Sequence, residues 1–125
     1  MALSTHRQNW GLLAILEELF EIGRLMITHT VAFRLKHPKA SPAEIAFLKD
    51  ALALADIPGV QDFQRMHQVG TKADFDFGFS MRFADQAAYD GYNSHPVHVA
   101  FVQERWLPEV EAFIELDYVS LGEDG

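Results

Sequence analysis

The chain has 125 residues, the usual size of one domain, and 49% of them are hydrophobic, which is too many for a disordered chain. It carries 10 Lys and Arg residues against 18 Asp and Glu residues, and the resulting formal charge of −8 argues against nucleic acid and anionic membranes as partners. The lack of cysteine excludes disulfides, thiolate metal sites and cysteine nucleophiles, and agrees with an expected cytoplasmic location.

The first 25 residues differ in pattern from the rest of the chain. Apolar residues recur there at helical spacing, with glutamates between them: Leu12, Ile15, Leu16, Leu19 and Phe20. The apolar run in this region is too short to span a bilayer and has no signal-type cleavage site, so we expect neither a membrane segment nor a secretory leader. We predict an N-terminal amphipathic helical extension over 1–25, a folded domain over 26–121 and a tail over 122–125.

The first half of the domain predicts a strand, a helix and a turn. Apolar and other residues alternate from Ile27 to Leu35, which indicates a strand with one buried face. The segment 41–44, Ser-Pro-Ala-Glu, is a capping box with proline at the first helical position. The apolar stripe expected of this helix is Ile45, Leu48 and Leu52. The segment 57–60, Ile-Pro-Gly-Val, predicts a type II turn.

The second half predicts two strands, two helices and a final strand. The strands cover about 62–69 and 75–83, with a hairpin loop at 70–72. Asp85 is expected to cap a helix that ends near Tyr92. Pro96 begins a further helix to about Trp106, which Pro108 ends or kinks. The last strand covers about 112–119.

This element order predicts an α+β, ferredoxin-like fold, in which a four-stranded antiparallel sheet has helices on one face. The last strand is apolar on both sides, with Phe113 on one side and Ile114, Leu116 and Tyr118 on the other. Because a lone domain covers one face of such a sheet, the second face is expected to meet another copy of the chain. The predicted partner is therefore the chain itself, as a homodimer.

Three residues from two separate parts of the sequence are candidates for chemistry. His29 lies on the buried side of the first strand, and Tyr92 and His98 lie at the junction of two helices, so the three can meet in one apolar cavity. Histidine transfers protons near neutral pH, and a tyrosine hydroxyl can donate to a carbonyl oxygen that gains charge. Aldol-type cyclisation, enolisation and decarboxylation are compatible reactions. The alternative is that the same residues are hydrogen-bonded packing groups.

The other polar and aromatic candidates have simpler interpretations. His95 and His98 are three residues apart, but the proline between them and the lack of a neighbouring carboxylate argue against a metal site. We expect no metal and no cofactor. His95 is placed near a helix cap, His67 is expected to face solvent, and the phenylalanines of 75–83 are expected in the core. Trp106 either packs there or closes one end of a pocket.

Several stretches resemble the stress-responsive A/B barrel (Dabb) domain family, from residue 26 to about 118. They are 27–33, 57–60, the closing pair 117–118, and 92–98, whose His-Pro-x-His element is the most specific. The resemblance implies a ferredoxin-like subunit whose sheet packs on its twin as a dimeric α+β barrel. It is also similar in outline to a plant polyketide cyclase of this family, which implies a catalytic pair at Tyr92 and His98 and a pocket position for His29. The N-terminal helix is not part of the usual family pattern.

These observations lead to a functional hypothesis with alternatives. The chain is expected to bind a small hydrophobic carbonyl or polyketide-like compound and to catalyse cofactor-independent cyclisation or proton transfer. His98 would be the general base, Tyr92 the proton donor, and the ligand-binding residues His29, Val31, Phe33, His95, Phe101 and Trp106. One alternative is a non-catalytic, stress-associated ligand-binding or structural protein, and another is a haem- or oxygen-using monooxygenase of related barrel shape.

Overall fold

The computed structural model describes residues 11–17 and 25–122. A short helix covers 11–17. The remaining elements follow the predicted order: β1 (Ile27–Leu35), α2 (Pro42–Asp50), the 3₁₀ helix η1 (Ala51–Asp56), β2 (Gln61–His67), β3 (Phe77–Phe83), α3 (Gln86–Ser94), α4 (Pro96–Phe101), the π-helical turn η2 (Val102–Trp106), α5 (Leu107–Glu109) and β4 (Val110–Tyr118).

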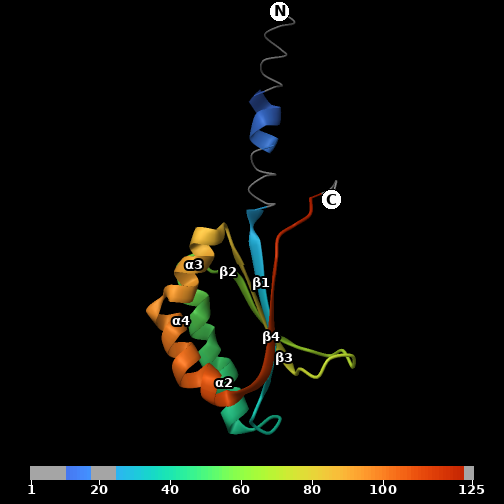
Figure 1. Cartoon of the computed structure of the whole chain (residues 1–125), viewed down its shortest axis with the longest axis vertical. Coiled ribbons are helices and arrows are strands. Elements are labelled where there is room, and N and C mark those ends of the chain that lie inside the picture. The colour runs from blue at the N-terminus through green and yellow to red at the C-terminus, as the bar shows by residue number, and fades with distance from the viewer. Residues whose placement is uncertain (1–10, 18–24, 123–125) are drawn as a thin grey trace, which may run out of the picture.

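The four strands form one antiparallel sheet in the order β2-β3-β1-β4. The helices α2, α3 and α4 all lie along one side of this sheet (Figure 1), and none of the described helices covers its other side, which we call the bare face. The predicted α+β, ferredoxin-like architecture is therefore confirmed. The central strands β1 and β3 alternate strictly between buried and half-buried residues, because one face of each is covered by the helices.

The core is built from aromatic side chains on the covered face. Phe33 is fully buried at its centre, and its ring lies 4.7 Å from Phe79, 5.0 Å from Trp106 and 5.9 Å from Phe47, measured between centroids. Offset and edge-to-face aromatic pairs of this kind add to the stabilisation that buried apolar area provides. The phenylalanines of β3 are in this core, as predicted.

Helix α2 begins as predicted, but it buries a different stripe. The Ser41 hydroxyl accepts a hydrogen bond from the Glu44 amide at 3.2 Å. The predicted stripe residues Ile45 and Leu52 are 59% and 44% exposed, which makes that part of the prediction wrong. The buried stripe contains Glu44, Phe47, Ala51 and Leu54, with Leu48 packed beside the core. The ring of Phe47 buries more area against the sheet than Ile45 would, and its burial sets the rotation of the helix.

The turn at 57–60 has the predicted geometry. The Val60 amide donates to the Ile57 carbonyl at 3.1 Å, and Gly59 has a φ of +91°. A Cβ at Gly59 would lie 3.4 Å from the Cβ of Ala88, so the turn itself packs closely against α3.

Replacing Gly59 by alanine is expected to lower the free energy of unfolding by about 1–2 kcal/mol, because alanine at positive φ is strained. The matched control is Gly91→Ala, where the added methyl group meets no atom within 4 Å and the position lies inside α3. That change is expected to be neutral or to stabilise by up to about 1 kcal/mol, because alanine has the higher helix propensity. Urea unfolding of both variants measures the difference, and equal stabilities would contradict it.

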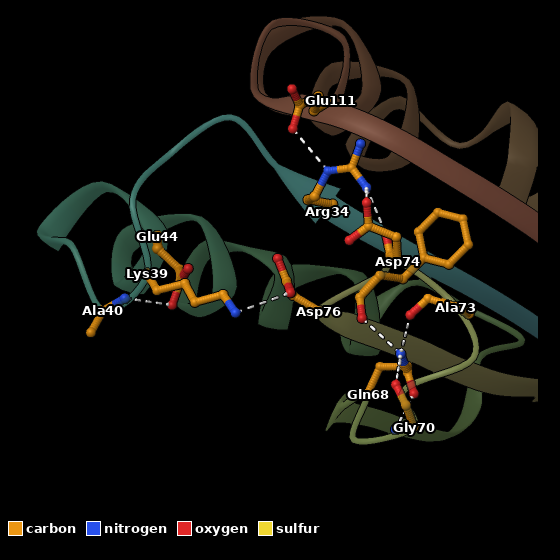
Figure 2. Close-up of polar contacts among 11 residues, drawn as sticks. Arg34, Lys39, Ala40, Glu44, Gln68, Gly70, Ala73, Asp74, Asp76 and Glu111 are labelled. Atoms are coloured by element: carbon orange, nitrogen blue, oxygen red, sulfur yellow. Dashed lines mark hydrogen bonds and ion pairs between the residues drawn. The ribbon is translucent and has the colours of Figure 1, made fainter.

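The loop between β2 and β3 is longer than the predicted hairpin at 70–72 and covers 68–76. Gln68 organises it, since its side-chain amide donates to the carbonyls of Gly70, Ala73 and Phe75 at 2.8–3.1 Å (Figure 2). Arg34 on β1 donates to the Asp74 carbonyl at 2.6 Å and to the Glu111 carboxylate at 2.9 Å. These side-chain bonds satisfy loop carbonyls that sheet pairing leaves free.

The predicted helix over 96–106 contains a π-helical turn and continues briefly as α5. The Leu107 amide donates to the carbonyl of Val102, five residues back. Pro108 has no amide hydrogen for the carbonyl of Glu104, so regular α-helical bonding stops there, as the proline predicted. Glu109 then receives hydrogen bonds from Arg105 at 2.6 Å and from His37 at 2.7 Å, which fixes the start of β4.

Strand β4 is the edge strand next to β1, and apolar side chains are exposed on both of its faces. Phe113 lies on the helix side and is 50% exposed, while Ile114, Leu116 and Tyr118 on the bare side are 45%, 46% and 52% exposed.

The short helix over 11–17 likewise exposes Leu12, Ile15 and Leu16, whereas the predicted stripe residues Leu19 and Phe20 lie outside the described residues. No helix in the described ranges has the length and apolar content to cross a bilayer.

Candidate functional site

A cavity of about 280 Å³ lies between the sheet and the helices, and it is partly open to solvent. Its volume is near the lower end of the roughly 300–1,000 Å³ of small-molecule pockets. Its apolar lining comes from the strands, from η1 and from the segment between α4 and α5. The apolar lining residues are Val31, Leu54, Phe79, Met81, Phe101, Val102, Trp106, Leu107 and Phe113. The polar residues in the lining are His29, Tyr92, His98 and Glu115.

Polar side chains gather at one end of the cavity, and aromatic apolar side chains lie further along it. The ring of Tyr92 lies 4.4 Å from the ring of His98 and 6.3 Å from that of His29, so these three form one polar end. Trp106 and Phe113 meet edge to face at 5.5 Å further along the sheet. A ligand in this cavity would therefore have an apolar body and a polar end that faces two imidazoles and a phenol.

The strand β1 places His29 in the cavity through its period of two. Its side chain points to the same face as Ile27, Val31 and Phe33, and only 5% of its surface is exposed. The Nδ1 atom of His29 lies 2.6 Å from Oδ1 of Asp117 on the neighbouring strand β4. A carboxylate accepts hydrogen bonds, so this contact places a hydrogen on Nδ1 and leaves Nε2 as the second position for proton transfer.

The α3–α4 junction places Tyr92 and His98 against each other. His95 ends α3, and its own Nδ1 accepts from the Val97 amide at 3.1 Å, while Pro96 occupies the first position of α4. His98, one turn into α4, donates from Nδ1 to the Asn93 carbonyl at 3.0 Å. This bond leaves Nε2 of His98 as the nitrogen with a lone pair.

The surroundings keep His98 neutral and Tyr92 protonated. Burial lowers the pKa of His98 below 6.5, and this outweighs the opposing effect of its bond to the Asn93 carbonyl. Burial also raises the pKa of Tyr92 well above its ordinary value, and the charge of Glu115 acts in the same direction. Within the described part of the chain, the Tyr92 hydroxyl has no hydrogen-bond partner. A neutral base and an unpaired phenol donor thus share one end of the cavity.

Two of the residues expected to contact a ligand do not line the cavity. Phe33 is 0% exposed and lies in the core next to it, and the ring of His95 is used as the helix cap just described. Val31, Phe101 and Trp106 do line it, together with the expected His29, Tyr92 and His98. As for metals, the described ranges hold no cluster of three or more His, Cys, Asp and Glu side chains, and His95 and His98 each use Nδ1 in a bond to the backbone.

Sequence reasoning assigned no role to Tyr89, Glu115 and Asp117. The Tyr89 hydroxyl donates to Oδ2 of Asp117 at 2.9 Å and also lies 2.9 Å from Nδ1 of His29. The alternation of residues along β4 could have indicated two of them, because Glu115 and Asp117 share a strand face with Phe113. Tyr89 precedes Tyr92 by one helical turn, which puts both tyrosines on the same side of α3.

Comparison with known proteins agrees with this architecture. Residues 27–120 match the family described as Stress responsive A/B Barrel Domain. A crystal structure of a Dabb family protein with a ferredoxin-like fold from Mesorhizobium loti is 58% identical, with a TM-score of 0.77, and the match covers 78% of this chain and 98% of that one. No curated protein matches the chain.

Two more distant structures share the fold. The hydroxynitrile lyase from Passiflora edulis is 20% identical with a TM-score of 0.69, over 78% of this chain and 94% of that one. A dimeric protein of unknown function with a ferredoxin-like fold from Bacteroides fragilis is 17% identical with a TM-score of 0.60, over 76% of this chain and 96% of that one. At these identities the likeness concerns the fold.

Proposed function

This chain belongs to the stress-responsive A/B barrel domain family, and we propose that it is a cofactor-independent enzyme that catalyses proton transfer and aldol-type carbon–carbon bond chemistry on a small, neutral, mostly apolar carbonyl compound. The observation that carries the proposal is the pairing of a neutral His98 with an unpaired Tyr92 hydroxyl at the polar end of one apolar cavity. A carbonyl next to an acidic C–H bond is the substrate feature that such a pair can activate.

The proposed steps follow from the positions of these groups. Nε2 of His98 removes a proton from the carbon next to the substrate carbonyl, and the electron pair of the broken C–H bond moves to the carbonyl oxygen. The Tyr92 hydroxyl donates a hydrogen bond to that oxygen and stabilises the enolate. The enolate carbon then forms a bond to a second carbonyl carbon, and the reverse sequence cleaves a β-hydroxycarbonyl compound. His29 faces the same end of the cavity and orients the substrate oxygen.

The cavity favours neutral substrates of modest size. Its apolar lining suits a hydrocarbon or aromatic body, and a volume of about 280 Å³ limits the substrate to small compounds. Glu115 in the lining adds negative charge, which repels carboxylate and phosphate groups. The structural likeness to a hydroxynitrile lyase supports chemistry on a small carbonyl-derived compound within this fold.

The test uses the aldol adduct of benzaldehyde and acetone, a neutral β-hydroxyketone of about a dozen non-hydrogen atoms that is small enough for such a pocket. The expected result is its cleavage to benzaldehyde, followed by ultraviolet absorbance, and exchange of the methyl and methylene protons of small ketones into D₂O, followed by NMR. Binding of the adduct without cleavage or exchange would contradict the enzymatic proposal.

That outcome would favour the second candidate, a ligand-binding protein without turnover. The nine apolar side chains of the lining are the observation that supports it, since they bind an apolar molecule whether or not a reaction follows.

We further propose that the chain works as a homodimer in which the bare faces of two sheets meet. Ile114, Leu116 and Tyr118 of β4 are exposed apolar residues of that face, and the dimeric relative with the same fold supports dimerisation.

Light scattering is expected to give about twice the chain mass of 14.1 kDa. Leu116→Glu should shift the protein toward the monomer, because it places a charge in the interface. The control Leu52→Glu alters a residue of similar exposure on the helix side and should leave the dimer intact. A monomeric wild-type protein at micromolar concentration would contradict the proposal.

A further inference from the structure

Three side chains behind the polar end of the cavity form a hydrogen-bonded group, His29, Tyr89 and Asp117, which we call the His29 cluster. They come from β1, α3 and β4, and every pair among them lies within 2.9 Å. His29 and Tyr89 are 5% and 8% exposed, while the side chain of Asp117 is 42% exposed at the sheet edge. The steps proposed above give this cluster no proton to transfer.

The donors and acceptors in the cluster allow one consistent arrangement. Burial, together with the hydrogen bond to Asp117 and its charge, raises the pKa of Tyr89, so its hydroxyl keeps its hydrogen. That hydroxyl donates to Oδ2 of Asp117, and Nδ1 of His29 donates to Oδ1. Both oxygens of the carboxylate are then occupied by neighbours that hold it in one orientation. The proton that His29 can exchange with a ligand is therefore the one on Nε2, since Nδ1 is committed to Asp117.

The two histidines of the cavity differ in the group behind them. Nδ1 of His29 faces a carboxylate, and Nδ1 of His98 faces the neutral carbonyl of Asn93. A positive charge on His29 would be held by a direct hydrogen bond to the Asp117 carboxylate, whereas a charge on His98 is favoured only through space, by Glu115 of the cavity lining. His29 is therefore the better placed of the two to deliver a proton, and His98 the better placed to act as the base.

We infer that His29 is the general acid of the aldol step and that Tyr89 and Asp117 are its positioning residues. This inference rests on the proposed function and adds the second proton-transfer group that an aldol addition requires. It places the oxygen of the second carbonyl, the one attacked by the enolate, next to Nε2 of His29. The first carbonyl lies at Tyr92 and the C–H bond at His98.

The protons and electrons balance over the addition. The C–H bond breaks and its proton goes to Nε2 of His98, while its electron pair forms the new C–C bond to the second carbonyl carbon. The π electrons of that second carbonyl move to its oxygen, which takes the proton from Nε2 of His29. His29 is then neutral and His98 is protonated. Proton exchange with solvent restores the starting state, and the reverse order of steps cleaves the aldol.

The proton assignment can be tested without any substrate by ¹⁵N NMR of the imidazole nitrogens in the full-length protein. The hydrogen on Nδ1 of His29 is expected to be bonded to Asp117 and to give a strongly downfield-shifted proton signal. In Asp117→Asn, which keeps the shape of the side chain but removes its charge, this signal is expected to move upfield. A wild-type His29 with no hydrogen on Nδ1 would overturn the inference and leave the proposed function intact.

The positioning role is tested by the rate of aldol cleavage. Asp117→Asn and Tyr89→Phe are each expected to reduce kcat for the benzaldehyde–acetone adduct by about tenfold or more, with KM changed by less than about threefold. Tyr89→Phe retains the ring that stacks on Phe83 at 4.9 Å, so the packing of α3 is preserved. The control is Asp56→Asn, which makes the same change as Asp117→Asn at an exposed carboxylate at the end of η1, outside the cavity lining.

Unchanged kcat in both variants would overturn the positioning role. A wild-type protein that binds the adduct but does not cleave it would instead contradict the proposed function, and this inference with it. The NMR measurement distinguishes the two failures because it depends on no turnover.

Discussion

Replacing His98 by alanine is expected to reduce kcat/KM for cleavage of the benzaldehyde–acetone adduct by about 10²–10⁴-fold, the usual contribution of a general acid–base group, because His98 is the base of the addition and returns the proton to carbon in the cleavage. The fold should remain, because His98 is only partly buried and makes its hydrogen bond to the carbonyl of Asn93, which water can replace. The measurement is the absorbance assay for benzaldehyde, accompanied by thermal unfolding of the variant.

The matched control for this substitution is His67→Ala, which removes an exposed histidine on β2 outside the cavity. It is expected to leave kcat/KM unchanged. Retention of full activity in His98→Ala would show that His98 is not the base, and an equal loss in both variants would point to a general effect on the fold.

The pH dependence of the wild-type reaction provides an independent check on the same residue. Because burial lowers the pKa of His98 below 6.5, the imidazole remains neutral and basic at neutral pH and gains a proton only in more acidic solution. The rate at which ketone protons exchange into D₂O, a reaction in which His98 removes the proton, is therefore expected to fall on the acid side with a midpoint below 6.5.

The largest expected effect on stability comes from Phe33→Ala. This change is expected to lower the free energy of unfolding by about 3–5 kcal/mol, because it removes a buried ring and leaves a void that neighbouring side chains only partly fill. The rings of Phe47, Phe77, Phe79 and Trp106 all lie within 5.9 Å of Phe33, so four aromatic contacts are lost together. Urea unfolding measures the loss.

Phe113→Ala is the matched control for the core substitution. Phe113 is 50% exposed, so its truncation removes less buried area and creates no enclosed void. Its cost should be less than half that of Phe33→Ala. Similar costs for the two variants would mean that Phe33 is not the central packing residue that its complete burial indicates.

The local elements of this protein could be predicted from the sequence, because each depends on residues a few positions apart. The alternation from Ile27 to Leu35 defined β1, Ser41 defined the start of α2, and the positive φ that a type II turn requires explained Gly59. His29, Tyr92 and His98 were also expected to meet, since strand and helix periodicity indicated which way each side chain points.

Other features could not be predicted because they depend on how the elements pack. The rotation of α2 is set by the fit of Phe47 between Phe33 and Phe101, which overrode the stripe of Ile45 and Leu52. Phe33 shares a strand face with His29 and Val31, but the aromatic rings around it close that region completely, so it lies in the core and not in the cavity lining.

The sequence by itself therefore determined the order of the elements, the fold class and the three residues at the polar end of the cavity. Only the tertiary structure decided the proton partners of His29, because Tyr89 and Asp117 lie 60 and 88 residues away along the chain. Local periodicity indicates the face on which a side chain lies. Contacts between such distant residues depend in addition on strand register and on the packing of α3 against the sheet, which no local pattern specifies.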